Sequence, residues 1–390
     1  MRVVQAAFSS SGGAGSVATN TNEILLKNGV ESSTWFLTDS SLRGKPVSNW
    51  HLLPGAIVDE YLVKKPDEIS MFSLFRSEAG SARLETEAEV LHLHWWQDFD
   101  LPQMARSNRF SRVVFSLHDD RAFTGGCHSS GNCSGYETGC KSCPLSRRFF
   151  HNKISNNYSR TREEYNNFDD VVFVAPTVLM RDKAERAGLM ENWRVEVIPN
   201  PISLEYWDAN PSRAVQSSEK IKLGFIAANL GDKNKRLELA LLIVEKMIRN
   251  GRNVELETVG SNLPSEFKGK VRNHGPLTPR EITAVAASWH GLLLTSSYEN
   301  SPVVISEMAA LGIPTLTDGI LSVEDTLAMS GQSPVIGDFT EAIYGSGWKQ
   351  IIRHIESFSD RQKESLRNNV EKTLGPDVLF DKLKAVYRRG

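Results

Sequence analysis

Apolar residues are grouped in short runs along most of the chain, and each run is followed by a polar or glycine-containing stretch. Successive apolar positions of this kind predict buried strands, because the strands of a parallel sheet are covered on both faces. The first half of the chain has such runs at 3–8, 33–38, 89–96, 112–119 and 170–176. The second half has them at 222–230, 254–260, 291–297 and 313–318.

Helical spacing separates several of these runs, notably at 17–29 and 236–251. Strands that alternate with helices predict parallel sheets with helices on both faces, and the pattern restarts near residue 221. The stretch around 203–218 is rich in Pro, Asn and Ser and predicts a linker between two Rossmann-like α/β domains. In open parallel sheets, ligands bind beyond the carboxyl ends of the strands, so the loops after the strands are the expected sites.

Composition excludes several partners and locations. The 390 residues carry a formal net charge of −2, which gives no reason to expect nucleic acid as a partner. No apolar run reaches the roughly 18–20 residues that span a bilayer, and the amino terminus lacks the apolar region of a signal peptide. We therefore expect a cytoplasmic protein, in which lasting disulfides are uncommon.

The segment 291–317 is the most informative about a binding site. An apolar run ends in a polar loop, Ser301 is suited to be the N-cap of a helix, and Pro302 is suited to the first helical position. The backbone N–H groups of Val303 and Val304 would then lack partners within the helix. Unpaired N–H groups and the helix dipole together make a seat for a phosphate group.

Two carboxylates flank this helix start. Glu299 lies in the loop, and Glu307 shares a helix face with Val304. A carboxylate repels phosphate but accepts hydrogen bonds from neighbouring hydroxyl groups, so Glu307 suits a ribose diol and Glu299 a sugar. The alternative is one solvated glutamate on a helix and one chance glutamate in a turn.

Glu299, seven further residues, Glu307 and then MAALGIP (308–314) resemble the signature of the retaining family-4 glycosyltransferases. That resemblance implies the GT-B fold, in which two Rossmann-like domains face each other across a cleft. It also implies that Glu307 binds the nucleotide ribose, that Glu299 binds the donor sugar, and that the backbone at Asn300, Ser301, Val303 and Val304 binds the diphosphate. The final helix of this fold crosses back to the first domain, which predicts domains of 1–203 with 376–390, and 204–375.

The resemblance extends over nearly the whole chain. Gly12 and Gly13, in the stretch 9–16, match the Gly-rich loop after the first strand and would let a phosphate or sugar approach the backbone. His118 matches a histidine that the family places at a strand end near the reacting sugar. A loop histidine that caps a turn is the alternative. His92 and His94 share a strand face, where buried histidines with satisfied nitrogens are at least as common as ligands.

The segment 226–238 matches the family's phosphate-binding loop, with Lys235 as the lysine that neutralises the leaving diphosphate. Two positions depart from the pattern: Asn229 stands where an arginine is usual, and Arg236 where a glycine is usual. Arg236 or Lys233 could compensate; the alternative for these cations is a solvated helix start. The segment 271–282 resembles the loop that meets the nucleotide base, and its expected contacts are Gly275 and Leu277.

All four cysteines, Cys127, Cys133, Cys140 and Cys143, fall within one short segment. Four thiolates would bind one structural zinc ion; two disulfides or four free thiols are the alternatives. The flanking sequence resembles a subgroup of bacterial polysaccharide (colanic-acid-like) glycosyltransferases that carry a Cys-rich insertion, here 124–146. With all four cysteines used as ligands, no open position remains for catalysis, so we expect no catalytic metal.

The segment 147–162 interleaves cations with Phe149, Phe150 and Tyr158. It predicts either contact with a membrane surface or an ordinary solvated helix with core aromatic residues. The sequence as a whole predicts a retaining glycosyltransferase with a UDP- or GDP-type nucleotide-sugar donor. Its acceptor would be a polysaccharide or lipid-linked glycan, reached in the cytoplasm or at the inner face of the membrane. A nucleotide-sugar epimerase of the same fold and a non-catalytic nucleotide-sugar-binding scaffold are the alternatives.

Overall fold

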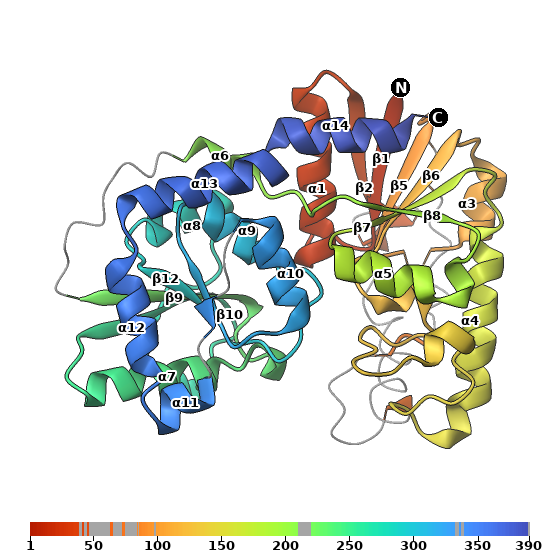
Figure 1. Cartoon of the computed structure of the whole chain (residues 1–390). Coiled ribbons are helices and arrows are strands. Elements are labelled where there is room, and N and C mark those ends of the chain that lie inside the picture. The colour runs from red at the N-terminus through yellow and green to blue at the C-terminus, as the bar shows by residue number, and fades with distance from the viewer. Residues whose placement is uncertain are drawn as a thin grey trace. The chain divides into compact units, whose positions relative to one another are not determined.

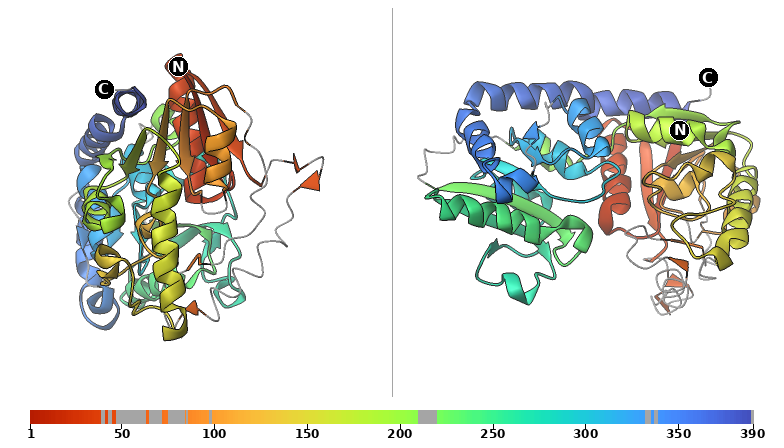
Figure 2. Two further views of the ribbon diagram at one scale, coloured as in Figure 1. Left: turned by 90° about the vertical axis from the view of Figure 1, so that its right-hand side faces the viewer. Right: turned by 60° about the horizontal axis from the view of Figure 1, so that its bottom comes forward.

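The computed structural model describes residues 1–38, 41–42, 45–46, 63–64, 72–74, 84, 86–96, 99–209, 220–331, 335–336 and 339–388. The chain divides into two compact units, Met1–Asn200 with Leu379–Gly390, and Pro201–Val378. In each unit the helices pack around a central sheet (Figures 1 and 2). The division falls within three residues of the expected boundaries at 203/204 and 375/376.

The first unit has a sheet of parallel strands in the order β2-β1-β5-β6-β7-β8. The strands are β1 (Arg2–Ala7), β2 (Glu31–Phe36), β5 (Val90–His94), β6 (Arg112–Ser116), β7 (Val171–Ala175) and β8 (Arg194–Val197). A separate antiparallel pair is formed by β3 (Ser41–Leu42) and β4 (Lys45–Pro46). The helices of the first unit include α1 (Gly12–Lys27), α3 (Leu101–Ser107), α4 (His151–Tyr165), α5 (Val178–Arg186) and most of α14 (Pro376–Tyr387).

The second unit also has a fully parallel sheet, in the order β11-β10-β9-β12-β13-β14. The strands are β9 (Ile221–Asn229), β10 (Val254–Ser261), β11 (Arg272–Asn273), β12 (Gly291–Leu294), β13 (Thr315–Thr317) and β14 (Val335–Ile336). The helices are α6 (Leu204–Asp208), α7 (Leu237–Arg249), α8 (Pro279–Ala286), α9 (Val303–Ala310), α10 (Leu321–Met329), α11 (Phe339–Tyr344), α12 (Trp348–Ser357) and α13 (Asp360–Leu374).

The strand orders locate the switch point of each sheet. In the second unit the order is the Rossmann order, and the chain leaves β9 toward β10 on one side and later returns to β12 on the other. In the first unit the corresponding reversal lies between β1 and β5. The loops after β9 and β12, and those after β1 and β5, therefore border the crevices where open parallel sheets bind ligands.

All nine apolar runs contain a strand of the sheets, so the predicted alternation is confirmed. Two predicted boundaries were wrong. The Gly-rich stretch 9–16 is a loop only as far as Ser11, because α1 already begins at Gly12. The predicted linker includes α6, where Tyr206 is buried in a core cluster with Ile202; the rest of it, 210–218, lies outside the described residues.

The carboxyl-terminal helix α14 is tied into the first unit by its last two turns. Leu379, Leu383, Val386 and Tyr387 are buried there. The Arg112 guanidinium donates to the carbonyl oxygen of Val386 at 2.7 Å and to that of Arg388, and it pairs with Asp170. Lone carbonyls at a helix end need such donors when they are buried. Within the described ranges, none of the helices has the length and apolar character needed to cross a membrane.

Candidate functional site

The two loops at the switch point of the second sheet are joined by Asn234. Its side-chain oxygen accepts from the backbone N–H of Tyr298 at 3.0 Å and from the Ser297 hydroxyl at 2.7 Å, and its amide donates to the Tyr298 carbonyl at 2.9 Å. The Thr295 hydroxyl donates back to the carbonyl of Lys235 at 2.8 Å. These bonds hold the β9–α7 loop against the β12–α9 loop, although the two lie about sixty positions apart in the sequence.

This arrangement brings two predicted catalytic residues into direct contact. Lys235 Nζ lies 2.5 Å from Glu299 Oε1, and both side chains are mostly buried, with 27% and 12% of their surface exposed. An ion pair with this little exposure is screened less than a surface pair, so each charge depends on the other when no ligand is bound. The site therefore holds a cation and a carboxylate that neutralise each other.

Arg236, which with Lys233 was one of two candidates to compensate for the missing arginine, contacts neighbouring loops in this structure. Its guanidinium donates to the carbonyls of Thr295 and Ser296 and pairs with Asp318 at 2.9 Å. Its backbone is left-handed (φ 50°) at the N-cap of α7, a conformation that costs a non-glycine residue free energy. The three side-chain contacts stabilise this turn and hold the loop after β9 against the loops after β12 and β13.

Helix α9 starts one residue later than the sequence predicts. Pro302 is the N-cap and Val303 the first helical residue, so the assignment of Ser301 as N-cap was wrong by one position. The proline ring fixes φ but leaves ψ free, and here Pro302 is extended. Val303 and Val304 still hold the first two positions of the helix, whose N–H groups have no acceptor in the helix. Asn300, just before them, is hydrogen-bonded to the Tyr298 hydroxyl.

Glu307 lies in the same helix, partly buried, and hydrogen bonds to the Tyr206 side chain. Burial raises the pKa of Glu307 to about 7, although the Tyr206 hydroxyl acts in the opposite direction. Burial next to this carboxyl also raises the pKa of Tyr206. Tyr206 comes from the segment predicted to be a linker, so its contact with Glu307 was not predicted.

The remaining predicted residues of the second unit lie at neighbouring loop ends. Asn229 ends β9 and accepts from the backbone of Gly231 at 3.0 Å. Gly275, with φ 73°, accepts from the N–H of Gly260 at 2.9 Å, which joins the loop after β11 to strand β10. Leu277 packs against the same core cluster as Val303 and Val304. Only the placement of these residues is observed, and their ligands remain predictions.

At the switch point of the first sheet, Gly12 and Gly13 open α1. A side-chain carbon at either position would meet no atom within 4 Å, so both face open space. Gly15, by contrast, approaches the backbone oxygen of Ser9 so closely that a side chain would clash at 2.2 Å. The glycines therefore serve two purposes: Gly15 permits close packing, and Gly12 and Gly13 leave the helix start accessible.

His118 follows β6 and lines a pocket with Trp95, Trp96, Ser116, Asp119, Arg121 and Ala122. Its Nε2 lies 3.1 Å from Nδ1 of His94. Burial lowers the pKa of His118 to about 4, against the raising effect of the Asp119 carboxylate. The ring is therefore neutral at pH 7. His92 and His94 are fully hydrogen-bonded core histidines, as the more ordinary of the two interpretations predicted.

Trp95 is a pocket residue that the sequence did not single out. It follows β5 in the left-handed conformation (φ 55°), which is uncommon for a bulky side chain. Its ring stacks on His128 at 4.9 Å between centroids. His128 in turn hydrogen bonds to Asp119 at 2.7 Å and to Ser73 at 2.6 Å. The Cys-rich segment thus supports one wall of the pocket that contains His118.

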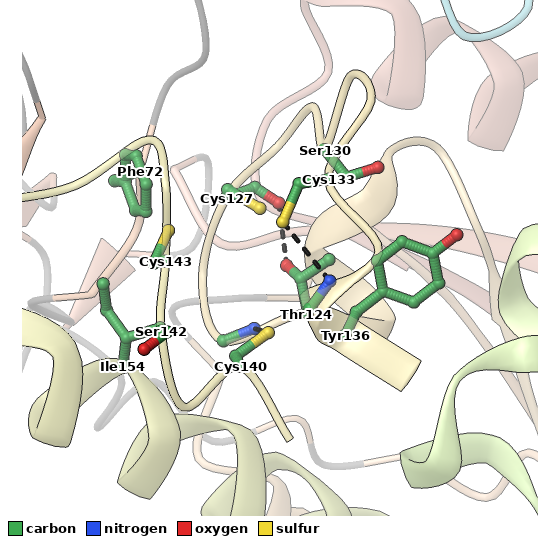
Figure 3. Close-up of a pocket in the computed structure, with 12 residues that line it drawn as sticks. Phe72, Thr124, Cys127, Ser130, Cys133, Tyr136, Cys140, Ser142, Cys143 and Ile154 are labelled. Carbon is green, nitrogen blue, oxygen red and sulfur yellow. Dashed lines mark hydrogen bonds between the residues drawn. The ribbon is translucent and has the colours of Figure 1, made fainter. Parts of the chain in front are cut away.

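The four cysteines surround a second cavity of the first unit, together with Phe72, Tyr136 and Ile154 (Figure 3). Cys127, Cys140 and Cys143 are buried, and all four are free thiols. The backbone N–H of Gly125 donates to Cys140 Sγ at 3.2 Å, and that of Gly135 to Cys133 Sγ at 3.3 Å. In the part of the chain that the structure describes, no three His, Cys, Asp or Glu side chains form a group that could hold a metal ion.

Comparisons with known proteins agree with this architecture, which is the GT-B fold. No family model matches the chain. The chain is 24% identical over 356 residues to WcaC, a protein of Escherichia coli (strain K12) assigned to colanic acid biosynthesis as a glycosyl transferase. The match covers 83% of this chain and 84% of WcaC.

Several solved structures share the fold. Sucrose-phosphate synthase from Thermosynechococcus elongatus superposes with a TM-score of 0.61 at 11% identity, over 100% of this chain and 98% of that one. HepE of Anabaena, solved with UDP-glucose, gives 0.57 at 12% identity, over 99% and 98%. TarM of S. aureus gives 0.54 at 12% identity over 77% of this chain, which spans about half of TarM (55%).

The raised pKa of Glu307 predicts that the native protein and the Glu307→Gln variant differ in stability by an amount that depends on pH. Because the pKa of the folded state is raised above the usual 4.5 of a glutamate, ionisation destabilises the fold. The penalty is absent at low pH, grows as the pH rises from about 4.5 to about 7, and is constant above that range. Glu307→Gln, which keeps the shape and a partner for Tyr206, should therefore stabilise the protein by roughly 1–3 kcal/mol at pH 8 and by little at pH 4.5.

Thermal unfolding of both proteins across this pH range measures the difference. Glu266→Gln, at an exposed position of the same unit, is the matched control and should give a constant difference. A Glu307→Gln difference that is equally flat would contradict the raised pKa.

Proposed function

We propose that the chain is a retaining glycosyltransferase that moves a sugar from a nucleotide-sugar donor to a glycan acceptor. The observation that carries this proposal is the meeting of Lys235, Glu299 and the start of α9 at the switch point of the second sheet. The similarity to WcaC and the GT-B fold support the same chemistry.

In this proposal the donor binds to the second unit. The N–H groups at the start of α9 and the Lys235 ammonium bind the diphosphate, and Glu307 accepts hydrogen bonds from the ribose hydroxyls. When Lys235 turns to the diphosphate, Glu299 loses its cation and accepts hydrogen bonds from the hydroxyls of the donor sugar. The fixed positive charge stabilises the diphosphate as it departs, which is the main electrostatic demand of the transfer.

Retention follows from how the carboxylates are used in this proposal. Glu299 binds the hydroxyls of the donor sugar and Glu307 binds the ribose, so neither carboxylate is assigned to attack the sugar from the opposite face. The acceptor hydroxyl then attacks on the face that the diphosphate leaves, and the departing phosphate oxygen takes its proton. The pocket around His118 and Trp95 in the first unit is the proposed contact for the sugars. HepE was solved with UDP-glucose and TarM with UDP, which favours a UDP-type donor.

Variants of the donor site test the proposal directly. Lys235→Ala and Glu299→Ala should each lower transfer at least about 100-fold, the usual cost of losing one such electrostatic contact. Lys270→Ala and Glu266→Ala remove the same charges at exposed positions of the same unit and should leave the rate unchanged. Gly13→Ala meets no protein atom, so it should keep full thermal stability while transfer falls.

The measurement is product formation from a panel of nucleotide sugars and glycan acceptors, with the anomeric configuration of the product read by NMR. Epimerised nucleotide sugar without transfer would identify an epimerase. Donor binding without any turnover would identify a scaffold, and an inverted product would overturn the retaining mechanism.

We also propose that the four cysteines hold one structural zinc ion. They line one cavity, three of them are buried, and backbone N–H groups point at two of the sulfurs, as is common around metal-bound thiolates. The thiols do not converge in the present arrangement, so binding would require side-chain rotation toward the cavity. The ion would fix the segment that supports Trp95 and His128, and it would take no part in the transfer.

Metal analysis of the purified protein should find about one zinc ion per chain. Cys140→Ser and Cys143→Ser should each lose the ion and lower the melting temperature, and a strong chelator should do the same to the native protein. Ser142→Ala, an exposed position between the two cysteines, should keep both. Four titratable thiols with no bound metal in freshly prepared protein would reject the site.

A third proposal concerns an exposed patch at 147–153. Phe149 is 89% exposed, and Arg147, Arg148 and Lys153 are exposed around it. Tyr158 is buried and hydrogen-bonded to the Tyr136 carbonyl, as the alternative of a helix with core aromatic residues predicted for it. We propose that the smaller patch contacts the anionic surface of a membrane that holds a lipid-linked acceptor.

Binding to vesicles of phosphatidylcholine with and without phosphatidylglycerol tests this contact. The native protein should bind the anionic vesicles, and replacing Arg147 or Arg148 by Gln should weaken binding about five-fold each. Phe149→Ser should weaken it as well, whereas Tyr344→Ser, which removes an 82% exposed aromatic ring from the second unit, should not. Failure of the native protein to bind anionic vesicles would end the proposal.

A further inference from the structure

Glu257 places a carboxyl group inside the second sheet. It lies on β10, between β9 and β11, and is 1% exposed. A carboxylate that leaves water loses its hydration, and only donors and cations of the protein can replace what is lost. An apolar side chain would fill the same space without this cost. The partners of Glu257 therefore indicate what its charge is used for.

The two oxygens of Glu257 meet groups from three neighbouring segments. Oε2 accepts from His274 Nε2 at 2.8 Å and from Trp289 Nε1 at 3.1 Å. Oε1 lies 3.2 Å from the Lys222 ammonium of β9 and 3.8 Å from the Arg272 guanidinium of β11. Burial alone would raise the pKa of Glu257, but the hydrogen bonds that it accepts hold the pKa below its usual value. The group is therefore ionised at pH 7 and can only accept.

His274 belongs to the loop that leads from β11 to α8, and this loop is held from two successive residues of β10. Glu257 accepts from the His274 ring, and the next residue, Thr258, donates its hydroxyl to the Asn273 side chain at 3.0 Å. The Thr258 carbonyl also accepts from the backbone N–H of His274 at 2.9 Å. Successive side chains of a strand point to opposite faces of the sheet, so the start of the loop is held on both faces.

Gly275 follows at the carboxyl end of β10, which is the edge where open parallel sheets bind ligands. Its carbonyl accepts from the N–H of Gly260, near the end of β10, at 2.9 Å. A side-chain carbon on Gly275 would meet no atom within 4 Å, so this residue borders open space. The loop is thus anchored to β10 and remains accessible at a residue that the sequence assigns to the nucleotide base.

We propose that Glu257 is a positioning residue for the nucleotide base of the donor, and that it fixes the loop 273–277 through His274. The inference rests on the proposed function, because Gly275 and Leu277 are base contacts only if the donor is a nucleotide sugar. Glu257 is buried in the sheet and does not touch the donor. A displaced loop would lose the distinction between bases and would keep the diphosphate contacts, which come from other loops.

The first experiment follows the loop in the absence of nucleotide. Hydrogen–deuterium exchange of the full-length protein, measured by mass spectrometry, reports on the N–H groups of Gly260 and His274. Glu257→Gln has one accepting oxygen in place of two and no charge, and His274→Ala removes the donor. Each variant should speed exchange in the peptides that contain these groups about ten-fold or more, the equivalent of one hydrogen bond to a charged group.

Glu255→Gln is the matched control for this experiment. Glu255 precedes Glu257 by two residues on the same face of β10, and it pairs with Lys220 at 3.0 Å. The variant also loses an ion pair with β9 and should leave the exchange of the loop unchanged. His274→Ala, at a partly exposed position, decides the question if Glu257→Gln does not fold. Native exchange rates in the folded variants would overturn the proposal.

The second experiment measures the selectivity for the base. Calorimetric titration with UDP, GDP and ADP should show that the native protein prefers one of the three by at least about ten-fold. In Glu257→Gln and His274→Ala, the affinity for the preferred nucleotide should fall about ten-fold, and the other two affinities should stay within about two-fold. Lys235→Ala should weaken all three together, because it removes a contact to the diphosphate that they share. Glu255→Gln should change none.

The outcomes separate the positioning role from the proposed function. If nucleotides bind with a preferred base and no sugar is ever transferred, the proposed function fails, and the selectivity of the variants still decides the role of Glu257. If transfer is measured and Glu257→Gln keeps the native selectivity, the positioning role fails while the proposed function stands. A native protein that binds none of the three nucleotides would overturn both.

Discussion

A polar group that is removed from water must find a partner inside the protein, and this requirement shapes both sheet ends. At the end of the second sheet, Asn234 satisfies the backbone of Tyr298, and Lys235 and Glu299 satisfy each other. At the end of the first sheet, the requirement extends into the core, where His94 and Gln5 continue the bonds of His118. The side chains at both sheet ends are held in place because the groups that they hydrogen bond to are themselves held by the fold.

The same requirement makes distant segments depend on one another. Arg236, in the loop after β9, hydrogen bonds to the loop after β12 and pairs with Asp318 after β13. A displacement of one of these loops would therefore strain its bonds to the other two. Tyr387 stands at the far end of the chain from Gln5 and yet meets it directly. In a parallel sheet, neighbouring strands are separated by whole helices in sequence, and such long-range contacts are the ordinary way to brace their ends.

The two proposed sites differ in the groups that they offer to a ligand. The donor site of the second unit has an ion pair and a helix start, which suit a charged diphosphate. The pocket of the first unit is lined by the rings of Trp95, Trp96 and His118 and by the charged side chains of Asp119 and Arg121, a mixture that suits sugars with their apolar faces and hydroxyl groups.

The sequence by itself predicted nine of the twelve strands in the two described sheets, because burial on both faces of a parallel sheet demands apolar residues at successive positions. It did not predict β8, β11 and β14, which lie at the sheet edges and are short. It also indicated the start of α9 and Glu299 as candidates from the residue types that follow a strand, and Lys235 through the resemblance to the retaining family-4 glycosyltransferases. It placed the start of α9 one residue early, treated α6 as a linker, and overlooked Asn234, Trp95, Tyr206, Gln5 and Tyr387. His92 and His94 within the apolar run at 89–96, and a glutamine within the run at 3–8, were the visible signs of a buried polar network. The partners of these residues were decided by the tertiary structure, since a hydrogen bond between Gln5 and Tyr387 leaves no periodicity or spacing in the sequence that could reveal it.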